Sequence, residues 1–133
     1  MLEVYIDGAS AGNPGLSGIG IYIKGEGHDV KISEPIKPTN NHSAEFQALI
    51  RGLEEAVKLT TGMVSVRSDS KIVVQSVDKQ FVKSEQYAPY LLQILQLIEH
   101  FEFFFIKWIP DSNNRTADSL ARNAILQQKK AKG

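Results

Sequence analysis

The chain has 133 residues, of which 42% are hydrophobic and 23% are charged, and its 15 Lys and Arg residues balance its 15 Asp and Glu residues. This length and composition predict one globular domain with a hydrophobic core and exclude a disordered chain. The chain has no cysteine, which excludes a disulfide scaffold, a cysteine-ligated zinc site, an iron–sulfur cluster and a thiol nucleophile. Zero net charge argues against a protein that coats nucleic acid by bulk electrostatics, but it leaves room for a local basic groove.

The two ends of the chain carry no recognisable targeting signal. Residues 1–7 lack the basic and apolar regions of a signal peptide, and the longest apolar run, 103–106, is far below the roughly 20 residues of a membrane span. We therefore expect a cytoplasmic protein with no membrane partner and no obligatory protein partner. The last residues, 129–133, are basic and are expected to form a frayed tail, so the expected single domain covers residues 1–128.

Hydrophobic periodicity and turn residues predict nine elements. In chain order they are strands over 2–7, 20–23 and 30–32, a helix that begins after 40–43 and ends near 59, a strand over 64–68, helices over 70–77 and 89–100, a strand over 103–108, and a helix over 114–128. A strand–helix–strand connection forces parallel pairing with a right-handed crossover. The predicted fold is α/β, a five-stranded mixed sheet of three antiparallel strands followed by parallel additions, with helices on both faces. Because 103–108 is rich in Phe, we expect that strand to be mostly buried and Trp108 to belong to the core.

Two aspartates stand at the ends of predicted strands. Asp7 ends the first strand, and Asp69 ends the strand that follows the first helix. If these strands are parallel neighbours, both carboxylates lie at the carboxyl-end edge of the sheet, where open α/β sheets bind ligands. Either aspartate alone is more typical of a residue that caps a turn, whereas the pair at equivalent ends favours a functional site.

Two further carboxylates lie on the apolar sides of predicted helices. Glu45 falls on the apolar arc of its helix, whereas Glu54 and Glu55 fall on the polar arc. The dipole of a first helical turn explains a carboxylate at that position, but it does not explain the inward direction. Asp118 lies at the edge of the apolar stripe of the last helix, where a surface ion pair with Arg122 is an equally good explanation.

Four carboxylates without a His or Cys partner suit a hard cation. Mg²⁺ prefers oxygen ligands and is typically held by a few carboxylates together with substrate phosphates. Two such ions about 4 Å apart activate a water molecule and stabilise the leaving oxygen of a phosphodiester. Rival motifs are incomplete: the chain has no Gly-x-Ser-x-Gly elbow, 12–15 lacks the Gly-Lys-Ser/Thr of a nucleotide loop, and 111–122 ends in Arg122 where a calcium loop needs Glu.

Four blocks of sequence resemble those of type 1 ribonuclease H, in the family's order. They are Tyr5–Gly15, Ala44–Leu49, Ser68–Ser70 and Ala117–Ala121. The resemblance covers nearly the whole chain and implies a ribonuclease H-like fold of the short form, without the basic handle that some relatives insert between the middle helices. It also implies endonucleolytic hydrolysis of the RNA strand of RNA–DNA hybrids.

The resemblance further implies which residues act. The catalytic residues that it implies are Asp7, Glu45, Asp69 and Asp118. These residues would hold two Mg²⁺ ions when substrate is bound, and Mn²⁺ would be able to replace Mg²⁺. The expected substrate contacts are Ser10, Gly12 and Asn13 to the RNA backbone, Asn41 to the minor groove, and Asn114 near the phosphates. Lys83 is the expected contact to a phosphate of the DNA strand, although a solvated lysine is the more common role of such a residue.

The chain also departs from the family pattern. His42 stands where a second Asn commonly follows Asn41, the loop between Trp108 and Asp118 is too short to carry the family's loop His, and Asp111 stands where a shorter-looped subgroup usually has Arg. The absence of the loop His or Arg and the sparse basic surface favour, as an alternative, a catalytically weak or inactive module that binds hybrids or structured RNA. The four carboxylates argue against that alternative, because clustering them costs stability. Metal-dependent processing of DNA is a third, less favoured function.

Overall fold

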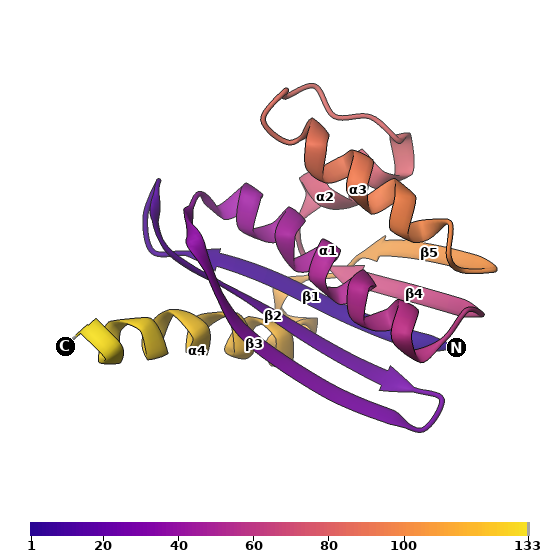
Figure 1. Cartoon of the computed structure of the whole chain (residues 1–133), viewed down its shortest axis with the longest axis horizontal. Helices are drawn as coiled ribbons and strands as arrows, with labels where there is room; N and C mark the ends of the chain where they lie inside the picture. Colours follow the sequence, from indigo (N-terminus) through magenta and orange to yellow (C-terminus); the bar gives the residue numbers. More distant parts are fainter. Residues whose placement is uncertain (133) are drawn as a thin grey trace.

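The computed structural model describes residues 1–132 and contains one five-stranded sheet with helices on both faces (Figure 1). The elements are β1 (Leu2–Ser10), β2 (Gly15–Gly25), β3 (His28–Thr39), α1 (Asn41–Leu59), β4 (Met63–Ser68), α2 (Lys71–Lys79), α3 (Ala88–Ile98), β5 (Phe103–Trp108), the 3-10 turn η1 (Asp111–Asn113) and α4 (Arg115–Lys132). The strands lie in the order β3-β2-β1-β4-β5. No helix within residues 1–132 is long and apolar enough to cross a membrane.

The strand pairing brings the ends of β1 and β4 together. β1 pairs with β2, and β2 with β3, in antiparallel directions, whereas β1–β4 and β4–β5 are parallel pairs. In the parallel pair of β1 and β4, Ile6 lies opposite Ser68. The next residue on each strand is an aspartate, so the register itself places Asp7 beside Asp69.

Helices α1 and α4 pack on opposite faces of this sheet. A Cβ atom on Gly52 of α1 would contact the side chains of Val4, Ile6 and Ile21, which belong to the main hydrophobic core. A Cβ atom on Gly20 of β2 would instead lie 2.1 Å from a backbone oxygen of α4. Because neighbouring residues of a strand point to opposite faces, Ile21 and Gly20 place the two helices on opposite sides. Helices α2 and α3 lie on the α1 side (Figure 1).

Several element boundaries differ from those predicted. Helix α1 begins at Asn41, because Asn40 is the N-cap and accepts a hydrogen bond from the backbone N–H of Ser43 at 2.8 Å. The prediction that the helix begins after residue 43 is therefore late. Helix α4 continues to Lys132, through residues for which we predicted a frayed tail, and Gly133 lies outside the described residues.

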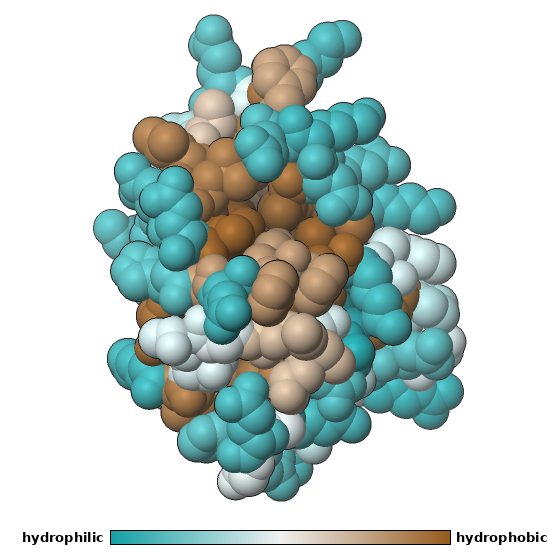
Figure 2. Space-filling view, turned by 90° about the vertical axis from the view of Figure 1, so that its right-hand side faces the viewer, coloured by the Kyte–Doolittle hydropathy of each residue, from teal (hydrophilic) through white to brown (hydrophobic). Residues whose placement is uncertain are grey.

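The prediction that the last strand is mostly buried is wrong. Phe103 and Phe105 of β5 are each 52% exposed, whereas Phe104 and Ile106 pack against the core. The reason is the position of β5 at the edge of the sheet, because α4 contacts β1, β2 and β3 and leaves this face of β5 uncovered. Apolar side chains accordingly reach the surface on the side of the molecule where β4 and β5 begin (Figure 2).

Candidate active site

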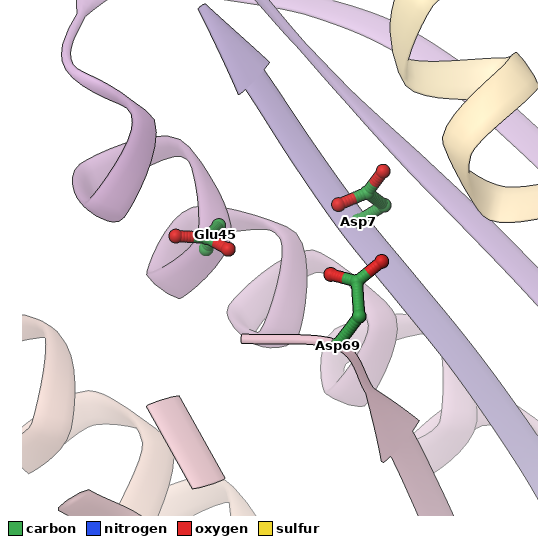
Figure 3. Close-up of side chains that lie close together, drawn as sticks. All are labelled: Asp7, Glu45 and Asp69. Atoms are coloured by element: carbon green, nitrogen blue, oxygen red, sulfur yellow. The ribbon is translucent and has the colours of Figure 1, made fainter. Parts of the chain in front are cut away.

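Three carboxylates from three different elements converge at the carboxyl-end edge of β1 and β4. Each of Asp7, Glu45 and Asp69 offers an oxygen, and these oxygens all lie within 4.8 Å of one another. Figure 3 shows the carboxylates of Asp7, on β1, and Asp69, just after β4, side by side, with Glu45 reaching them from α1. These are three of the four carboxylates selected from the sequence.

The approach of α1 to β1 brings Glu45 into this group. A Cβ atom on Gly8 would lie 2.2 Å from the carbonyl carbon of Ala44, so only a glycine lets the helix backbone come this close. Since Gly8 follows Asp7 and Ala44 precedes Glu45, this contact sets the distance between the two carboxylates. Helix α1 starts at Asn41, which leaves Glu45 beyond the first turn and weakens the helix dipole as the reason for its position.

The three carboxylates line a cavity of about 920 Å³. Asp118, in the first turn of α4, lines the same cavity but is not part of the group of three. Its side chain forms an ion pair with Arg122 at 3.0 Å. The two explanations offered for Asp118 from the sequence are therefore compatible, since the ion pair itself lies in the cavity.

Burial and mutual repulsion raise the pKa values of these carboxyl groups. Burial, the charge of Asp69, a hydrogen bond with the Asp118 side chain and the charges of Asp118 and Glu45 together raise the pKa of Asp7 to about 8. Burial also raises the pKa of Glu45 and of Asp69, against the opposing hydrogen bonds from His42 and Asn114 respectively. Burial and neighbouring negative charge thus disfavour the ionised form of these carboxyl groups.

This donor set fits a hard divalent cation. The ligand atoms are all carboxylate oxygens, lie close enough to share one ion, and are destabilised by one another's charge when no cation is bound. A bound divalent cation would remove that repulsion. Asp7, Glu45 and Asp69 are the residues positioned to hold it, with Asp118 available in the same cavity.

The residues expected to contact the RNA lie beside the carboxylates. Ser10, Gly12, Asn13 and Asn41 line a second cavity of about 790 Å³, and Ser10 and Asn41 also line the first. The side-chain oxygen of Asn41 accepts a hydrogen bond from the backbone N–H of Ser10 at 2.9 Å. This bond joins the last residue of β1 to the first residue of α1, and both residues border both cavities.

His42, which stands where the family commonly has Asn, contacts the cluster directly. Its Nδ1 lies 3.0 Å from Oε1 of Glu45, and its ring meets Tyr87 edge to face. His42 also lines the second cavity. It therefore connects the expected RNA-binding surface to one of the carboxylates.

The other two predicted contacts lie elsewhere. Asn114 is only 1% exposed, and its Nδ2 donates to the backbone oxygen of Ile6 at 2.9 Å and to Oδ2 of Asp69 at 3.4 Å. Asn114 therefore holds the Asp69 carboxylate from the protein interior and does not line the carboxylate cavity, because η1 turns the chain inward just before it. Lys83 is exposed in the loop after α2 and lines a separate cavity of about 350 Å³ with Lys79 and Phe81.

Four further side chains line the carboxylate cavity, one of which was expected in the core and three of which were not expected in the site. Trp108, expected in the core, is 45% exposed, lines the cavity and donates from Nε1 to the backbone oxygen of Asp69 at 3.0 Å. Lys71, whose ammonium lies 5.4 Å from the Trp108 ring centre, Asp111 and Arg122 line it too. The position of Trp108 at the end of the strand next to the one that Asp69 follows could have indicated that its side chain lies near Asp69.

Known proteins resemble this chain over almost its whole length. The family model described as "Reverse transcriptase-like" matches residues 5–124. The chain is 42% identical over 127 residues to "Putative hydrolase EbsB" of Enterococcus faecalis, covering 94% of both chains. It is 31% identical to the ribonuclease H of Zymomonas mobilis, with 98% of this chain and 94% of that one covered. Some relatives are longer, and the chain spans 34% of the bifunctional protein Rv2228c of Mycobacterium tuberculosis.

The solved structures agree with the sequence relatives. LC11-RNase H1, solved in complex with an RNA/DNA hybrid, superposes with a TM-score of 0.88 at 32% identity, and the match covers 96% of this chain and 99% of that one. The five-stranded mixed sheet with helices on both faces, predicted from the sequence, is thereby confirmed as ribonuclease H-like. The chain belongs to the type 1 ribonuclease H family.

Proposed function

We propose that this protein is a ribonuclease H-type endoribonuclease that hydrolyses the RNA strand of RNA–DNA hybrids and uses Mg²⁺ as its metal. The observation that carries this proposal is the convergence of Asp7, Glu45 and Asp69, with oxygens within 4.8 Å of one another, in a chain of the ribonuclease H family. The hybrid in the complex of LC11-RNase H1 supports the choice of substrate.

The carboxylates have the role of metal ligands in this proposal. Asp7, Glu45 and Asp69 hold the metal, and Asp118 is the fourth ligand of a two-ion site. Divalent ions at such a site lower the pKa of a bound water and stabilise the leaving oxygen of the phosphodiester. His42 and Asn114, bonded to Glu45 and Asp69, hold two of these carboxylates in position.

The polar groups of the second cavity would distinguish RNA from DNA. Ser10, Asn13 and Asn41 present hydroxyl and amide groups there, and these groups can exchange hydrogen bonds with 2′-hydroxyls across the wide minor groove of a hybrid. Lys83 and Phe81, around the more distant cavity, would contact the phosphates and sugars of the DNA strand.

A cleavage assay tests this function. Labelled hybrid, duplex RNA and duplex DNA are incubated with Mg²⁺, Mn²⁺ or chelator, and we expect cleavage of the RNA strand of the hybrid alone, only with a divalent ion. Asp69→Asn should abolish cleavage, whereas Asp78→Asn, on the exposed side of α2, should not. Cleavage in chelator, or products with a cyclic phosphate, would overturn the metal-dependent hydrolysis. Tight hybrid binding without cleavage in either metal would identify a binding module instead.

A further inference from the structure

One row of side chains crosses the whole sheet on the face opposite α1. In the strand register, Lys31 of β3 lies beside Tyr22, Tyr22 beside Tyr5, Tyr5 beside Arg67, and Arg67 beside Lys107 of β5. Residues that pair directly share one face of a sheet, so cations and aromatic rings follow one another along this line. We call these five residues the basic–aromatic row. At about 4.8 Å per strand, it is about 19 Å long.

Helix α4 leaves this row open. The helix covers the same face nearer the carboxyl end of β1, where Gly20 meets it, and it begins at Arg115. Beyond that point the two tyrosines are half-buried, and Lys31 and Lys107 are exposed. Between Tyr5, Tyr22 and the residues from Ser112 to Ala117 lies a cavity of about 200 Å³.

The row is basic in a chain that is neutral overall. Outside the carboxylate cavity, the register places four cations on this face, Lys24, Lys31, Arg67 and Lys107, against two carboxylates, Glu3 and Asp29. Glu3 is bonded to Arg67. Among the described residues, the three lysines form no ion pair with a carboxylate.

Two of these lysines, Lys24 and Lys31, place their ammonium groups over aromatic rings. Lys24 lies 5.5 Å from the ring centre of Tyr5, and Lys31 lies at the same distance from that of Tyr22. The two tyrosine rings stack with centres 5.9 Å apart. These rings hold Lys24 and Lys31 on the surface without neutralising them. In the register Lys24 also lies between Glu3 and Asp29, so Lys31 and Lys107 are the cations that remain most available to an anion.

A single turn of chain separates the row from the active site. Lys107 precedes Trp108, which lines the carboxylate cavity. In the segment that follows, Asp111 faces the carboxylate cavity, whereas Ser112 and Asn113 line the cavity next to the tyrosines. A polymer that leaves the active site past Trp108 and crosses η1 therefore reaches the row directly.

We propose that the basic–aromatic row binds a single-stranded nucleic acid extension of the hybrid held in the active site; this inference rests on the proposed function. Phosphates fit the unneutralised lysines, and bases fit the apolar rings between and beside them, including Phe105, which is exposed on the same face of β5. An acidic peptide would match the lysines but has no bases to stack on the rings. The RNA and DNA strands share this chemistry, so both are tested as the extension.

The test compares blunt and extended hybrids by fluorescence anisotropy in chelator. For the wild type, a single-stranded extension at one end of the hybrid, made of RNA in one arm and of DNA in the other, should lower Kd by about fivefold or more in at least one arm. In the double variant Lys31→Ala/Lys107→Ala that gain should disappear, and the slope of log Kd against log salt for the extended hybrid should fall by about 2. Lys58→Ala, a control on α1 whose lysine contacts Glu55, should keep the full gain. Phe105→Ala supplies a second variant that keeps every charge and should lose part of the gain.

Three outcomes would overturn the inference. An extension that adds no affinity in the wild type contradicts it, as does a gain that persists in the double variant. A poly-glutamate peptide that competes as well as a single-stranded oligonucleotide of equal charge would assign the row to an acidic protein partner. Cleavage of the blunt hybrid with Mg²⁺ is measured on the same samples. Absence of that cleavage counts against the proposed function, whereas cleavage without any effect of the extension counts only against the row.

Discussion

Asp111 gives the carboxylate cavity a further carboxylate, in the turn where the family resemblance leads one to expect an arginine. Burial is the main cause that raises the pKa of Asp69, and the charge of Asp111 contributes to the same rise. Asp111 also lines the cavity directly. A negative charge at this point repels the phosphates of the proposed substrate, so this residue lowers affinity where the related arginine would raise it.

Replacing this carboxylate by arginine should strengthen substrate binding. We expect Asp111→Arg to lower the Kd for an RNA–DNA hybrid by about tenfold at low salt and by less at high salt, because the change removes a negative charge and adds a positive one beside the phosphates. The measurement is a hybrid titration in chelator at two salt concentrations. Asp78→Arg makes the same change of charge on the outer side of α2 and should have a smaller effect. Equal effects of the two variants would show that net charge alone decides affinity.

The individual carboxylates were predictable because each carries a local signal. Asp7 and Asp69 end the strands that were predicted from the sequence, and Glu45 interrupts an apolar helix face, so neither a strand nor a helix pattern accounts for them. In the structure β1 continues to Ser10, but its pairing with β4 ends at Ile6. The support given by Asn114 was not predictable in the same way. Its contact with Asp69 joins residues 45 positions apart and depends on the path of η1, which no local pattern records.

At the level of elements, close packing of helices on glycines determines where the carboxylates meet. Gly8 brings α1 to the end of β1, and Gly20 brings the first turns of α4 to β2. Glu45 follows Ala44, which Gly8 contacts, and Asp118 follows Ala117, which Gly20 contacts. The positions of these carboxylates therefore depend on the packing of the helices as well as on the identity of the acidic residues.

Substituting Gly8 should disturb both stability and catalysis. In Gly8→Ala the new methyl group would lie 2.2 Å from the backbone of α1, which has no flexible atom to yield, so we expect a loss of about 3 kcal/mol in the free energy of unfolding. A helix that moves away to relieve the clash takes Glu45 with it, so cleavage should fall even in the folded fraction. Denaturant unfolding and a cleavage assay on the folded protein check these two effects.

Gly62→Ala is the matched control for this substitution. Its Cβ atom would lie 3.4 Å from the side-chain oxygen of Thr60, an ordinary contact, so stability and cleavage should stay close to the wild type. If Gly8→Ala behaves like Gly62→Ala, the approach of α1 does not depend on this glycine.

The elements themselves were predictable to different degrees. Strands and helices were found because their apolar spacing is local. The exposure of β5 was not foreseen, because a run of Phe residues is typical of a buried strand. Whether a strand lies at the edge, and whether a helix reaches it, depends on the order β3-β2-β1-β4-β5 and on where α4 begins.

Across the whole molecule, a net charge of zero conceals two separated regions of opposite sign. The carboxylate cavity gathers Asp7, Glu45, Asp69, Asp111 and Asp118 at one edge of the sheet. The basic–aromatic row lies on the face next to that edge. Composition alone predicted weak attraction to nucleic acid, whereas the folded chain places its excess charge of each sign at a defined position.

The carboxylate cavity should make the stability of the metal-free protein fall as the pH rises. Burial, followed by the charge of Asp69 and contacts with Asp118 and Glu45, raises the pKa of Asp7 in the folded state to about 8, far above the ordinary 3.8 of the unfolded chain. A carboxyl group whose pKa is raised by folding favours the folded state most fully below its unfolded pKa, and that contribution is lost as the pH rises to about 8. In chelator, we therefore expect Tm to fall by several degrees between pH 5 and pH 8.

Removing one charge of the cluster distinguishes the pH dependence of Tm caused by these carboxyl groups from that caused by other titrating groups. Asp69→Asn takes away the charge that acts most strongly on Asp7, so in chelator it should melt higher than the wild type at pH 8, and the difference should shrink at pH 5. Asp78→Asn should follow the wild-type curve, because that residue is exposed on α2. Millimolar Mg²⁺ should raise the wild-type Tm at pH 8 and raise that of Asp69→Asn less, since a ligand stabilises a protein by binding its folded state. If Asp69→Asn melts lower than the wild type in chelator at both pH values, the three carboxylates do not repel one another, and Asp69 serves the fold as a turn residue.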